Sequence, residues 1–205
     1  ETFNEKYGFP IKQAYGATET TPLVSAAIPK SYMADLSRDE LYDIRTSVGI
    51  VVMGLEMKLV NTEGKEARMD GKEWGEIWLR GPWIASEYYK DPERSKEAFA
   101  DGWYHTGDVA TMDSEGYVRL VDRTKDLVKS AGEWISSVDL ENTIMGHPKV
   151  AEAAIIGVPH PKWQERPLAC VTVAAGQSVT ADELKDYLKD KVKASWWIPD
   201  DFVFL

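Results

Sequence analysis

The 205-residue sequence predicts an α+β protein, in which a β-rich, barrel-like subdomain is followed by a small α+β domain. Before residue 122, several segments alternate apolar and polar residues with a period of two, which is typical of half-buried strands. After residue 123, strand-like segments are interspersed with two helix-start signals, which indicates a compact α+β unit. We therefore expect two domains, at 1–122 and 123–205.

The elements expected in the first domain follow an irregular stretch of 47 residues that contains one short helix, at 37–43. Asp91 and Pro92 match an N-cap followed by proline at the first helical position, so a helix is expected from there to Phe99. Two β-hairpins are also expected, because alternating segments flank turn residues. Their strands are 55–60 with 76–80, and 109–112 with 117–121.

The second domain is predicted to have the order β-α-β-β-α-β. Its helices should begin at Ser136 and Thr180, because each is followed three residues later by an acidic residue that completes an N-terminal capping pattern. The first of these helices should end at Gly146. The expected strands are 127–130, 150–158, 168–175 and 202–205.

The composition argues against several classes of function. A net charge of −10 and a pI of about 4.9 are unsuited to nucleic acid or to anionic membranes, which are bound by clustered cations. The longest apolar stretch, 48–55, is far shorter than the roughly 20 residues of a membrane-spanning helix. The single cysteine, Cys170, cannot form an internal disulfide, so a reducing compartment and a cytoplasmic location are expected.

The segment Tyr15–Glu19 places an aromatic ring, a flexible glycine, a hydroxyl and a carboxylate in one turn. Such a set can stack on a base, let the backbone approach a phosphate and hold Mg²⁺ through an oxygen ligand. The alternative is a Gly-Thr turn with a solvated glutamate, and these five residues alone favour that alternative.

A second polar turn, Gly102–Asp108, leads into a predicted strand. The two oxygens of the Asp108 carboxylate can accept hydrogen bonds from two vicinal hydroxyl groups, such as those of a ribose. The alternative, that Asp108 caps the turn while Thr106 bonds to the backbone, is equally compatible with the sequence.

Two further segments lie where the pattern changes. Four of the five residues in 122–126 are charged, which suits a hinge between domains but also an ordinary charged linker. In the following segment, 129–134, Gly132 could let the backbone pass close to a thin ligand and Trp134 could stack on a ring or line a channel. Without further context, a glycine bend beside a core tryptophan is the more economical interpretation.

Together, four segments in this order and spacing resemble the motifs of the adenylate-forming superfamily, which contains acyl-CoA synthetases, luciferases and nonribosomal-peptide adenylation domains. The conjunction of the four is specific and extends over the whole chain, whereas each motif alone is not. The segments are YGATE (15–19), GEIWLRG (75–81), GWYHTGD (102–108) and DRTKDLVKSAGE (122–133).

Within the superfamily, the segments 129–142 and 160–167 look most like medium- and long-chain fatty-acyl-CoA synthetases. Many members have arginine at the position of Trp134, so the phosphate contact of such an arginine is not expected here. The resemblance also implies that residues 1–122 are the C-terminal part of a large domain, made of the end of an α/β subdomain and a β-rich subdomain. Residues 123–205 would then form most of a small mobile domain.

The resemblance implies a two-step reaction with ATP, Mg²⁺ and CoA, in which a carboxylic acid is converted to acyl-AMP and then to a thioester. Thr18 and Glu19 would be the catalytic residues, with Glu19 as the metal ligand, and Lys125 would lie at the hinge. Nucleotide or CoA contacts are implied for Tyr15 (adenine), Gly16, Asp108 and Arg123 (ribose), and for Gly132 and Trp134 on the path of the pantetheine arm.

The same resemblance implies that the family's phosphate loop lies before residue 1 and its catalytic lysine after Leu205. We therefore expect the C-terminal portion of a fatty-acid–CoA ligase that is inactive alone, with an acyl chain length and an oligomeric state that the sequence does not reveal. Two alternatives stay open: a non-catalytic homologue that binds nucleotide or CoA, and a ligase for another carboxylic acid.

Overall fold

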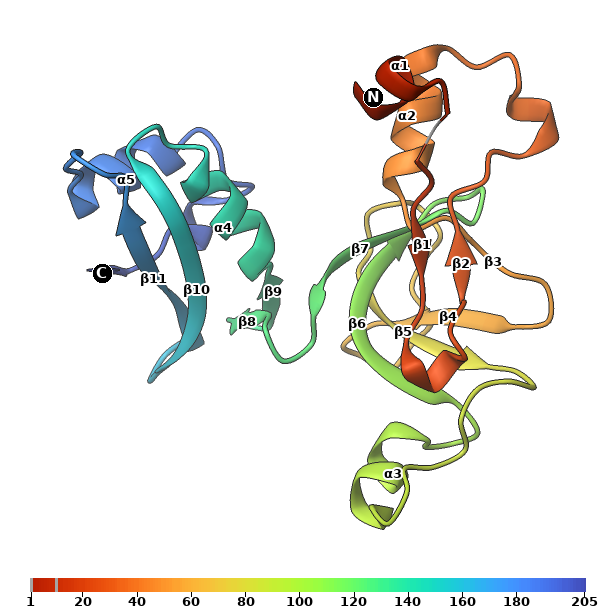
Figure 1. The fold of residues 1–205 in the computed structure, drawn as a ribbon. Helices are drawn as coiled ribbons and strands as arrows, with labels where there is room; N and C mark the ends of the chain where they lie inside the picture. Colours follow the sequence, from red (N-terminus) through yellow and green to blue (C-terminus); the bar gives the residue numbers. More distant parts are fainter. Residues whose placement is uncertain (1, 10) are drawn as a thin grey trace. The chain divides into compact units, whose positions relative to one another are not determined.

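A computed structural model describes residues 2–9 and 11–205, and these fall into two compact units. The first unit ends at Leu120 and the second begins at Val121. The course of the chain through each unit is drawn in Figure 1. The domain limits expected from the sequence, 1–122 and 123–205, remain a prediction, because they concern which parts of the protein move as rigid domains.

The first unit begins with a small antiparallel sheet of three very short strands in the order β1-β2-β3. The elements are α1 (Thr2–Tyr7), β1 (Ala14–Tyr15), η1 (Thr18–Thr20), β2 (Ser25–Ala26), η2 (Ser31–Met33), α2 (Arg38–Thr46) and β3 (Ile50–Val51). Helix α2 lies close to the predicted 37–43, because Ser37 and Glu40 form a reciprocal capping box at its start.

The second sheet of this unit has four strands in the order β4-β5-β6-β7. Its elements are β4 (Glu56–Val60), β5 (Gly75–Arg80), α3 (Pro92–Ala98), β6 (Tyr104–Met112) and β7 (Val118–Arg123). Both predicted hairpins are present. The predicted helix start is also confirmed, since the Asp91 side chain accepts a hydrogen bond from the Arg94 N–H and Pro92 is the first helical residue.

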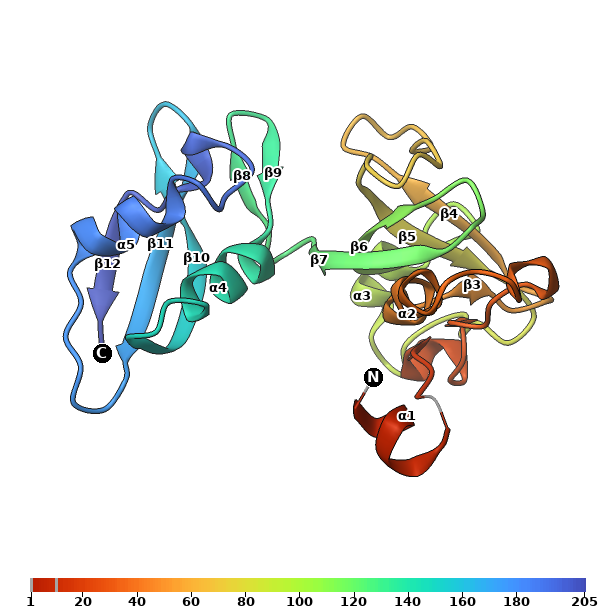
Figure 2. The ribbon, with the colours of Figure 1, turned by 90° about the horizontal axis from the view of Figure 1, so that it is seen from above.

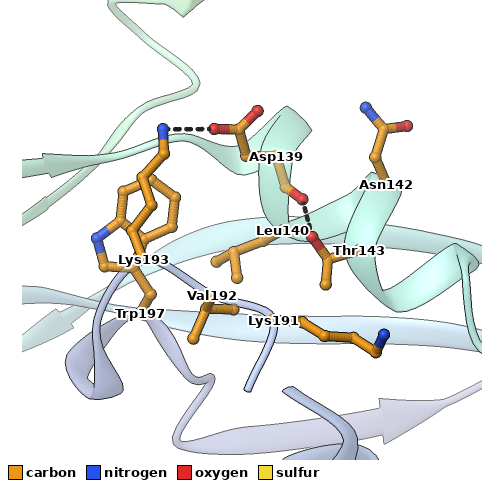
Figure 3. A pocket seen from close by; sticks show the side chains of 8 residues that line it. All are labelled: Asp139, Leu140, Asn142, Thr143, Lys191, Val192, Lys193 and Trp197. Carbon is orange, nitrogen blue, oxygen red and sulfur yellow. Dashed lines mark hydrogen bonds and ion pairs between the residues drawn. The ribbon is translucent and has the colours of Figure 1, made fainter. Parts of the chain in front are cut away.

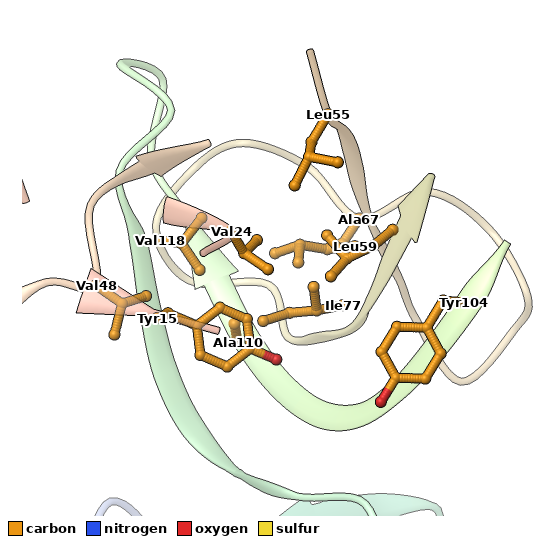
Figure 4. Close-up of a cluster of buried hydrophobic side chains, with 11 residues drawn as sticks. Tyr15, Val24, Val48, Leu55, Leu59, Ala67, Ile77, Tyr104, Ala110 and Val118 are labelled. Atoms are coloured by element: carbon orange, nitrogen blue, oxygen red, sulfur yellow. The ribbon is translucent and has the colours of Figure 1, made fainter. Parts of the chain in front are cut away.

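The predicted barrel-like shape requires a correction, because the four-stranded sheet is open among the described residues. Closing a barrel requires its edge strands to pair with each other. Instead, the edge strand β7 meets the segment before β3, through an isolated bridge between Val118 and Gly49. Side chains of both sheets fill one common core, which Figure 4 draws. It includes Tyr15, Val24, Val48, Leu55, Leu59, Ala67, Ile77, Leu79, Tyr104, Ala110 and Val118.

The second unit is a mixed α+β fold around a five-stranded sheet. Its long hairpin β10–β11 pairs at one end of β11 with the small hairpin β8–β9, and β12 runs parallel to β11. The elements are β8 (Val128–Ser130), β9 (Glu133–Ile135), α4 (Ser137–Met145), β10 (Val150–His160), β11 (Gln164–Val173), α5 (Ala181–Leu188), η3 (Ser195–Trp197) and β12 (Asp201–Phe204).

The helices of the second unit cover the sheet with their apolar sides. Leu140 and Ile144 of α4 and Leu184 and Leu188 of α5 are fully buried. The two helices contact each other, and Figure 2 shows both beside the strands β10, β11 and β12. Their starts are as predicted, at the N-caps Ser136 and Thr180, while the strand β9 was not predicted.

Candidate functional site

The first group of predicted site residues lies where β1 meets β6 in the first unit. Tyr15 ends β1, and its ring is part of the core, with 9% of the residue exposed. Its hydroxyl donates a hydrogen bond to Oδ2 of the half-buried Asp108, on β6, at 2.6 Å. Two motifs that are 93 residues apart in the sequence therefore share one hydrogen bond.

Gly16 begins the turn after β1, and close packing requires a glycine there. A Cβ atom at this position would lie 1.6 Å from the carbonyl oxygen of Pro22. Thr20, which is 1% exposed, closes the same turn. Its Oγ1 accepts a hydrogen bond from the Ala17 N–H at 2.8 Å and lies 2.9 Å from the carbonyl oxygens of Ala17 and Pro22. The turn is thus fixed by contacts within the segment.

Thr18 and Glu19 lie together on the 3-10 turn η1 (Thr18–Thr20). The Thr18 side chain is exposed, as a group that contacts a ligand must be. Glu19 is half-buried, and Oε1 of its carboxylate accepts a hydrogen bond from the hydroxyl of Tyr88 at 2.8 Å. The Glu19 carbonyl oxygen accepts another from the Ala85 N–H at 2.8 Å. Both ends of the residue are therefore held by the segment before α3.

Three tyrosines around these carboxylates stay protonated over a wide pH range. Burial and the hydrogen bond to Asp108 raise the pKa of Tyr15 far above its ordinary value. Burial and the bond to Glu19 likewise raise the pKa of Tyr88, and burial beside Glu19 raises the pKa of Tyr104. Neutral phenol groups therefore surround the two carboxylates, and those of Tyr15 and Tyr88 donate hydrogen bonds to them.

A shallow hollow of about 260 Å³ opens beside the turn. It is lined by Ala14, Tyr15, Gly16, Ala17, Pro22 and Leu23. Its wall combines backbone groups of the turn with apolar side chains, a mixture suited to a flat aromatic ring with polar edges. The described part of the first unit thus brings Tyr15, Gly16, Thr18, Glu19 and Asp108 to one neighbourhood, while their roles remain predictions.

Arg123 and Lys125 lie at the start of the second unit: Arg123 ends β7, and Lys125 lies in the connection from β7 to β8. Both are exposed. The carbonyl oxygen of Arg123 accepts hydrogen bonds from the N–H groups of Asp126 and Leu127, which form a turn around Lys125. The neighbouring Asp122 caps α4, because its Oδ2 accepts bonds from Ser137 N–H and Oγ–H at 2.7 and 2.9 Å.

Gly132 and Trp134 lie in the β8–β9 hairpin of the second unit. Gly132 is exposed at the tip with a φ of +83°, which favours glycine although a Cβ atom there would meet nothing within 4 Å. Trp134 is half-buried on β9 opposite Lys129 of β8. A hollow of about 380 Å³ adjoins the tip, lined by Ser130, Ala131, Glu133, Trp163, Arg166, Trp196 and Asp200.

Another hollow of the second unit, of about 340 Å³, lies between α4 and the segment after α5, and Figure 3 shows it. Its polar groups are largely paired with each other. Lys193 donates to the Asp139 carboxylate at 3.0 Å, and the Thr143 hydroxyl donates to the Asp139 carbonyl at 2.6 Å. None of the predicted site residues lines this hollow.

Four residues that hold the site were not found by sequence reasoning: Thr20, Glu76, Tyr88 and Asp122. Glu76 and Asp122 lie inside recognised motifs, which is the signal that could have found them. Within residues 2–9 and 11–205, no three His, Cys, Asp or Glu side chains converge to hold a metal ion. In the same ranges no helix is long and apolar enough to span a membrane.

The fold and these motifs define the class of the protein: the chain belongs to the adenylate-forming family of AMP-binding enzymes. The family model described as AMP-binding enzyme matches residues 1–89, and the model described as AMP-binding enzyme C-terminal domain matches residues 139–205.

Individual relatives narrow the comparison to acid–CoA ligases. The chain is 47% identical over 201 residues to a long-chain-fatty-acid–CoA ligase of Thermus thermophilus, covering 98% of this chain and 37% of the relative. It is 41% identical over 203 residues to a medium-chain-fatty-acid–CoA ligase of Ectopseudomonas oleovorans, covering 99% and 37%. The chain thus spans little more than a third of the length of these relatives.

A solved structure agrees with the fold. The o-succinylbenzoate CoA synthetase of Bacillus subtilis, in complex with its acyl-adenylate intermediate, superimposes with a TM-score of 0.79 at 31% identity, covering 100% of this chain and 39% of that one. The same enzyme with ATP and a magnesium ion gives 0.77 at 30% identity, covering 98% and 39%. The agreement extends over both units, although it covers only part of the solved enzyme.

Proposed function

We propose that this chain is part of an AMP-forming acid–CoA ligase, whose first unit contributes to the nucleotide site and whose second unit contributes to the CoA site. The observation that supports this most is the hydrogen bond from Tyr15 to Asp108 at 2.6 Å, beside the turn that carries Glu19. Three groups suited to an adenosine phosphate are thereby gathered from segments far apart in the sequence.

In the first step, an oxygen of the acid's carboxylate attacks the α-phosphorus of ATP, and the bond from that phosphorus to the pyrophosphate oxygen breaks. The products are acyl-AMP and pyrophosphate. We propose that the hollow lined by Tyr15 receives the adenine. Asp108 accepts hydrogen bonds from the ribose hydroxyls, and Thr18 donates one to a phosphate oxygen. These groups act mainly by positioning, which is the protein's main contribution to such transfers.

The residues of this site suit the way in which proteins usually bind Mg²⁺ together with a nucleotide. Mg²⁺ commonly takes one or two carboxylates and completes its coordination with phosphate oxygens and water. Glu19 is one such carboxylate, held half-buried by Tyr88 at 2.8 Å, and a cage of protein ligands is not required. When bound, the ion would neutralise part of the phosphate charge, and Glu19 would hold it.

In the second step, the CoA sulfur attacks the acyl carbon, the bond from that carbon to the AMP oxygen breaks, and the thiol proton is released. We propose that Gly132 and Trp134 flank the pantetheine arm, that Arg123 contributes at the ribose and that Lys125 is the hinge. The tip of the β8–β9 hairpin supports this, because Gly132 leaves the backbone uncovered beside a hollow of about 380 Å³.

For the acid, we propose a fatty acid, because two ligases named for fatty acids are 47% and 41% identical to this chain. A 3-methylmercaptopropionyl-CoA ligase of Ruegeria lacuscaerulensis is 43% identical, however, so a ligase for another acid is the competing proposal. A panel of fatty acids from short to long chain, with 3-methylmercaptopropionate included, discriminates between them through kcat/KM in the full-length parent.

The experiment that tests the function is acid-dependent release of pyrophosphate from Mg-ATP by the full-length parent, followed by thioester formation when CoA is added. The proposal expects both. Binding of AMP without release of pyrophosphate from any acid would favour the non-catalytic nucleotide-binding alternative. The 205 residues alone should release no pyrophosphate, since the relatives named as ligases are much longer. Release of pyrophosphate by these residues alone would overturn the proposal that they are inactive without the rest of the protein.

A further inference from the structure

The strand β6 leaves its regular pairing with β5 at the three residues before Val109. One residue of β5, Ile77, faces Thr106, Gly107 and Asp108 of β6. The paired residues on either side are Gly75 with Ala110, Glu76 with Val109, Trp78 with His105 and Leu79 with Tyr104. A bulge of this kind redirects a side chain and often lies at an active site. Here it carries Asp108, the candidate ribose ligand.

Side chains satisfy the backbone groups that the bulge removes from the ladder. The Asp108 N–H donates to Oγ1 of Thr106 at 3.0 Å, and the Thr106 hydroxyl donates to the Ile77 carbonyl at 2.9 Å. The Gly107 N–H donates to Oε1 of Glu76 at 2.9 Å. Gly107 has a φ of +72°, so this N–H points in a direction that regular strand geometry does not allow.

Both carboxylate oxygens of Glu76 are occupied. While Oε1 holds the Gly107 N–H, Oε2 accepts a hydrogen bond from Nε1 of Trp78 at 3.0 Å. The indole ring of Trp78 stacks on the imidazole of His105, with ring centroids 3.7 Å apart and an angle of 14° between the planes. Glu76 therefore links the rigid ladder of β5 to the bulge, and Trp78 fixes the orientation of its carboxylate.

We propose that Glu76 is a positioning residue for Asp108, and that Trp78 holds Glu76 in place. The carboxylate fixes the Gly107 peptide, and this peptide sets the direction in which Asp108 leaves the strand. The inference rests on the proposed function, in which Asp108 receives the ribose hydroxyls. It adds that Glu76, which does not contact the nucleotide, sets the strength of ribose recognition by holding Gly107, the residue next to Asp108.

The test uses the Glu76→Gln variant of the full-length parent. The Gly107 and Trp78 N–H groups bond to different oxygens of Glu76, and glutamine replaces one of these oxygens with an NH2 donor, so one of the two N–H groups would face a donor. We expect the KM for ATP to rise by about tenfold, as when an outer partner of a binding group is removed, with a smaller change in kcat. The preference for ATP over 2′-deoxy-ATP in kcat/KM should fall, because the deoxy analogue lacks one hydroxyl for Asp108. Trp78→Phe keeps the stacked ring and should lower the preference less.

Glu73→Gln is the matched control. Glu73 lies just before β5 in the same unit and accepts bonds from Arg68 Nε at 2.7 Å and Asn61 Nδ2 at 2.8 Å, but it has no bond to the bulge. This variant should leave the preference for ATP unchanged. Thermal unfolding of each variant confirms that the sites being compared are folded.

The outcomes separate the inference from the function on which it rests. If Asp108→Ala removes the preference for ATP and Glu76→Gln reduces it, with no further loss in the double variant, both stand. If Asp108→Ala removes the preference while Glu76→Gln retains it, the positioning role is wrong. Equal losses with both nucleotides in Glu76→Gln also overturn it. If the wild type shows no preference for ATP over 2′-deoxy-ATP, the ribose role of Asp108 is wrong, and the positioning role of Glu76 that rests on it is wrong as well.

Discussion

The two units hold their candidate residues in different ways. In the first unit, Tyr15 and Glu19 share one segment, and each is tied to a distant segment by a hydroxyl-to-carboxylate bond. Tyr15 donates to Asp108 at 2.6 Å, and Tyr88 donates to Glu19 at 2.8 Å. In the second, Gly132 and Trp134 belong to one short hairpin, and the tip at Gly132 is exposed. The first arrangement is a preorganised constellation, and the second is a local turn that presents backbone.

This difference has a physical consequence for how each region responds to substitution. When a side chain is held by partners from distant segments, substituting it also disturbs those partners. The effects of substitutions at the two contacting residues should therefore not be additive. At Gly132 an added Cβ atom would meet nothing within 4 Å, so a substitution there should act through the backbone conformation of the tip. Substitutions in the two units therefore test the comparison directly.

The largest effect is expected from Glu19→Gln in the full-length parent. It removes the charge that would hold Mg²⁺ while it keeps the shape, and the rate of adenylate formation should fall by about 100-fold, the scale of losing one preorganised charge contact. The control is Glu63→Gln, which loses only an exposed pair with Lys65. Measured as acid-dependent pyrophosphate release, equal rates in both variants would contradict the metal role.

Next in size is the contrast between Gly16→Ala and Gly132→Ala. At Gly16, the new Cβ atom would lie 1.6 Å from a backbone oxygen, so we expect a loss of about 2–3 kcal/mol in the free energy of unfolding. At Gly132 only the φ of +83° opposes alanine, which costs about 1 kcal/mol. Chemical denaturation of the two variants measures both, and the reverse order would break the comparison.

A smaller effect is expected from Tyr15→Phe, which keeps the buried ring and removes the hydroxyl that bonds to Asp108. Loss of this single bond should lower the free energy of unfolding by about 1 kcal/mol. In a double-mutant cycle with Asp108→Ala, the two losses should not add, because both remove the same bond. Additive losses would mean that the two residues act independently.

Lys125→Pro tests the proposed hinge in the second unit by comparing its effects on the two steps of the reaction. The N–H groups that form this turn belong to Asp126 and Leu127, so proline at 125 removes no donor of the turn, but it restricts the backbone of the connection at 125 and at the preceding Thr124. If the connection is a hinge, thioester formation should slow several-fold, while acid-dependent pyrophosphate release stays near its original rate. Equal slowing of both steps would argue for a purely structural role of the turn.

The smallest effect concerns pH and an exposed ion pair of the first unit. Arg68 and Asn61 hold the pKa of Glu73 well below its usual value, at about 2. A carboxyl group with a lowered pKa in the folded state stabilises the protein above its unfolded pKa, and this contribution is lost as the pH falls through the folded value. The stability difference between the wild type and Glu73→Gln should therefore narrow from pH 6 towards pH 3, as read from denaturant midpoints.

Local signals predicted much of the fold. The helix starts at Ser37, Asp91, Ser136 and Thr180 agree with the structure, because each depends on a side chain that bonds within three residues. The strand β9 was missed because the segment around Gly132 and Trp134 was interpreted as a glycine bend beside a core tryptophan. The barrel-like expectation was not met because strand closure depends on which distant edges meet.

The candidate site divides in the same way. Its candidate ligand groups, such as the exposed Thr18 and the half-buried Glu19, were predicted from residue types and spacing that suit nucleotide binding. The groups that hold them, including Tyr88 and Thr20, act through contacts whose geometry is set by tertiary structure or by one tight turn. The roles of the site residues and the cytoplasmic location remain predictions.

The most direct test of the account is fatty-acid-dependent exchange of pyrophosphate into ATP by the full-length parent and its Asp108→Ala variant. This exchange reports the adenylation step alone, without CoA. We predict that the wild type exchanges, and that the variant needs a much higher ATP concentration to reach the same rate, since two ribose contacts are lost. An unchanged KM for ATP in a folded variant would contradict the assignment of a nucleotide site to the first unit.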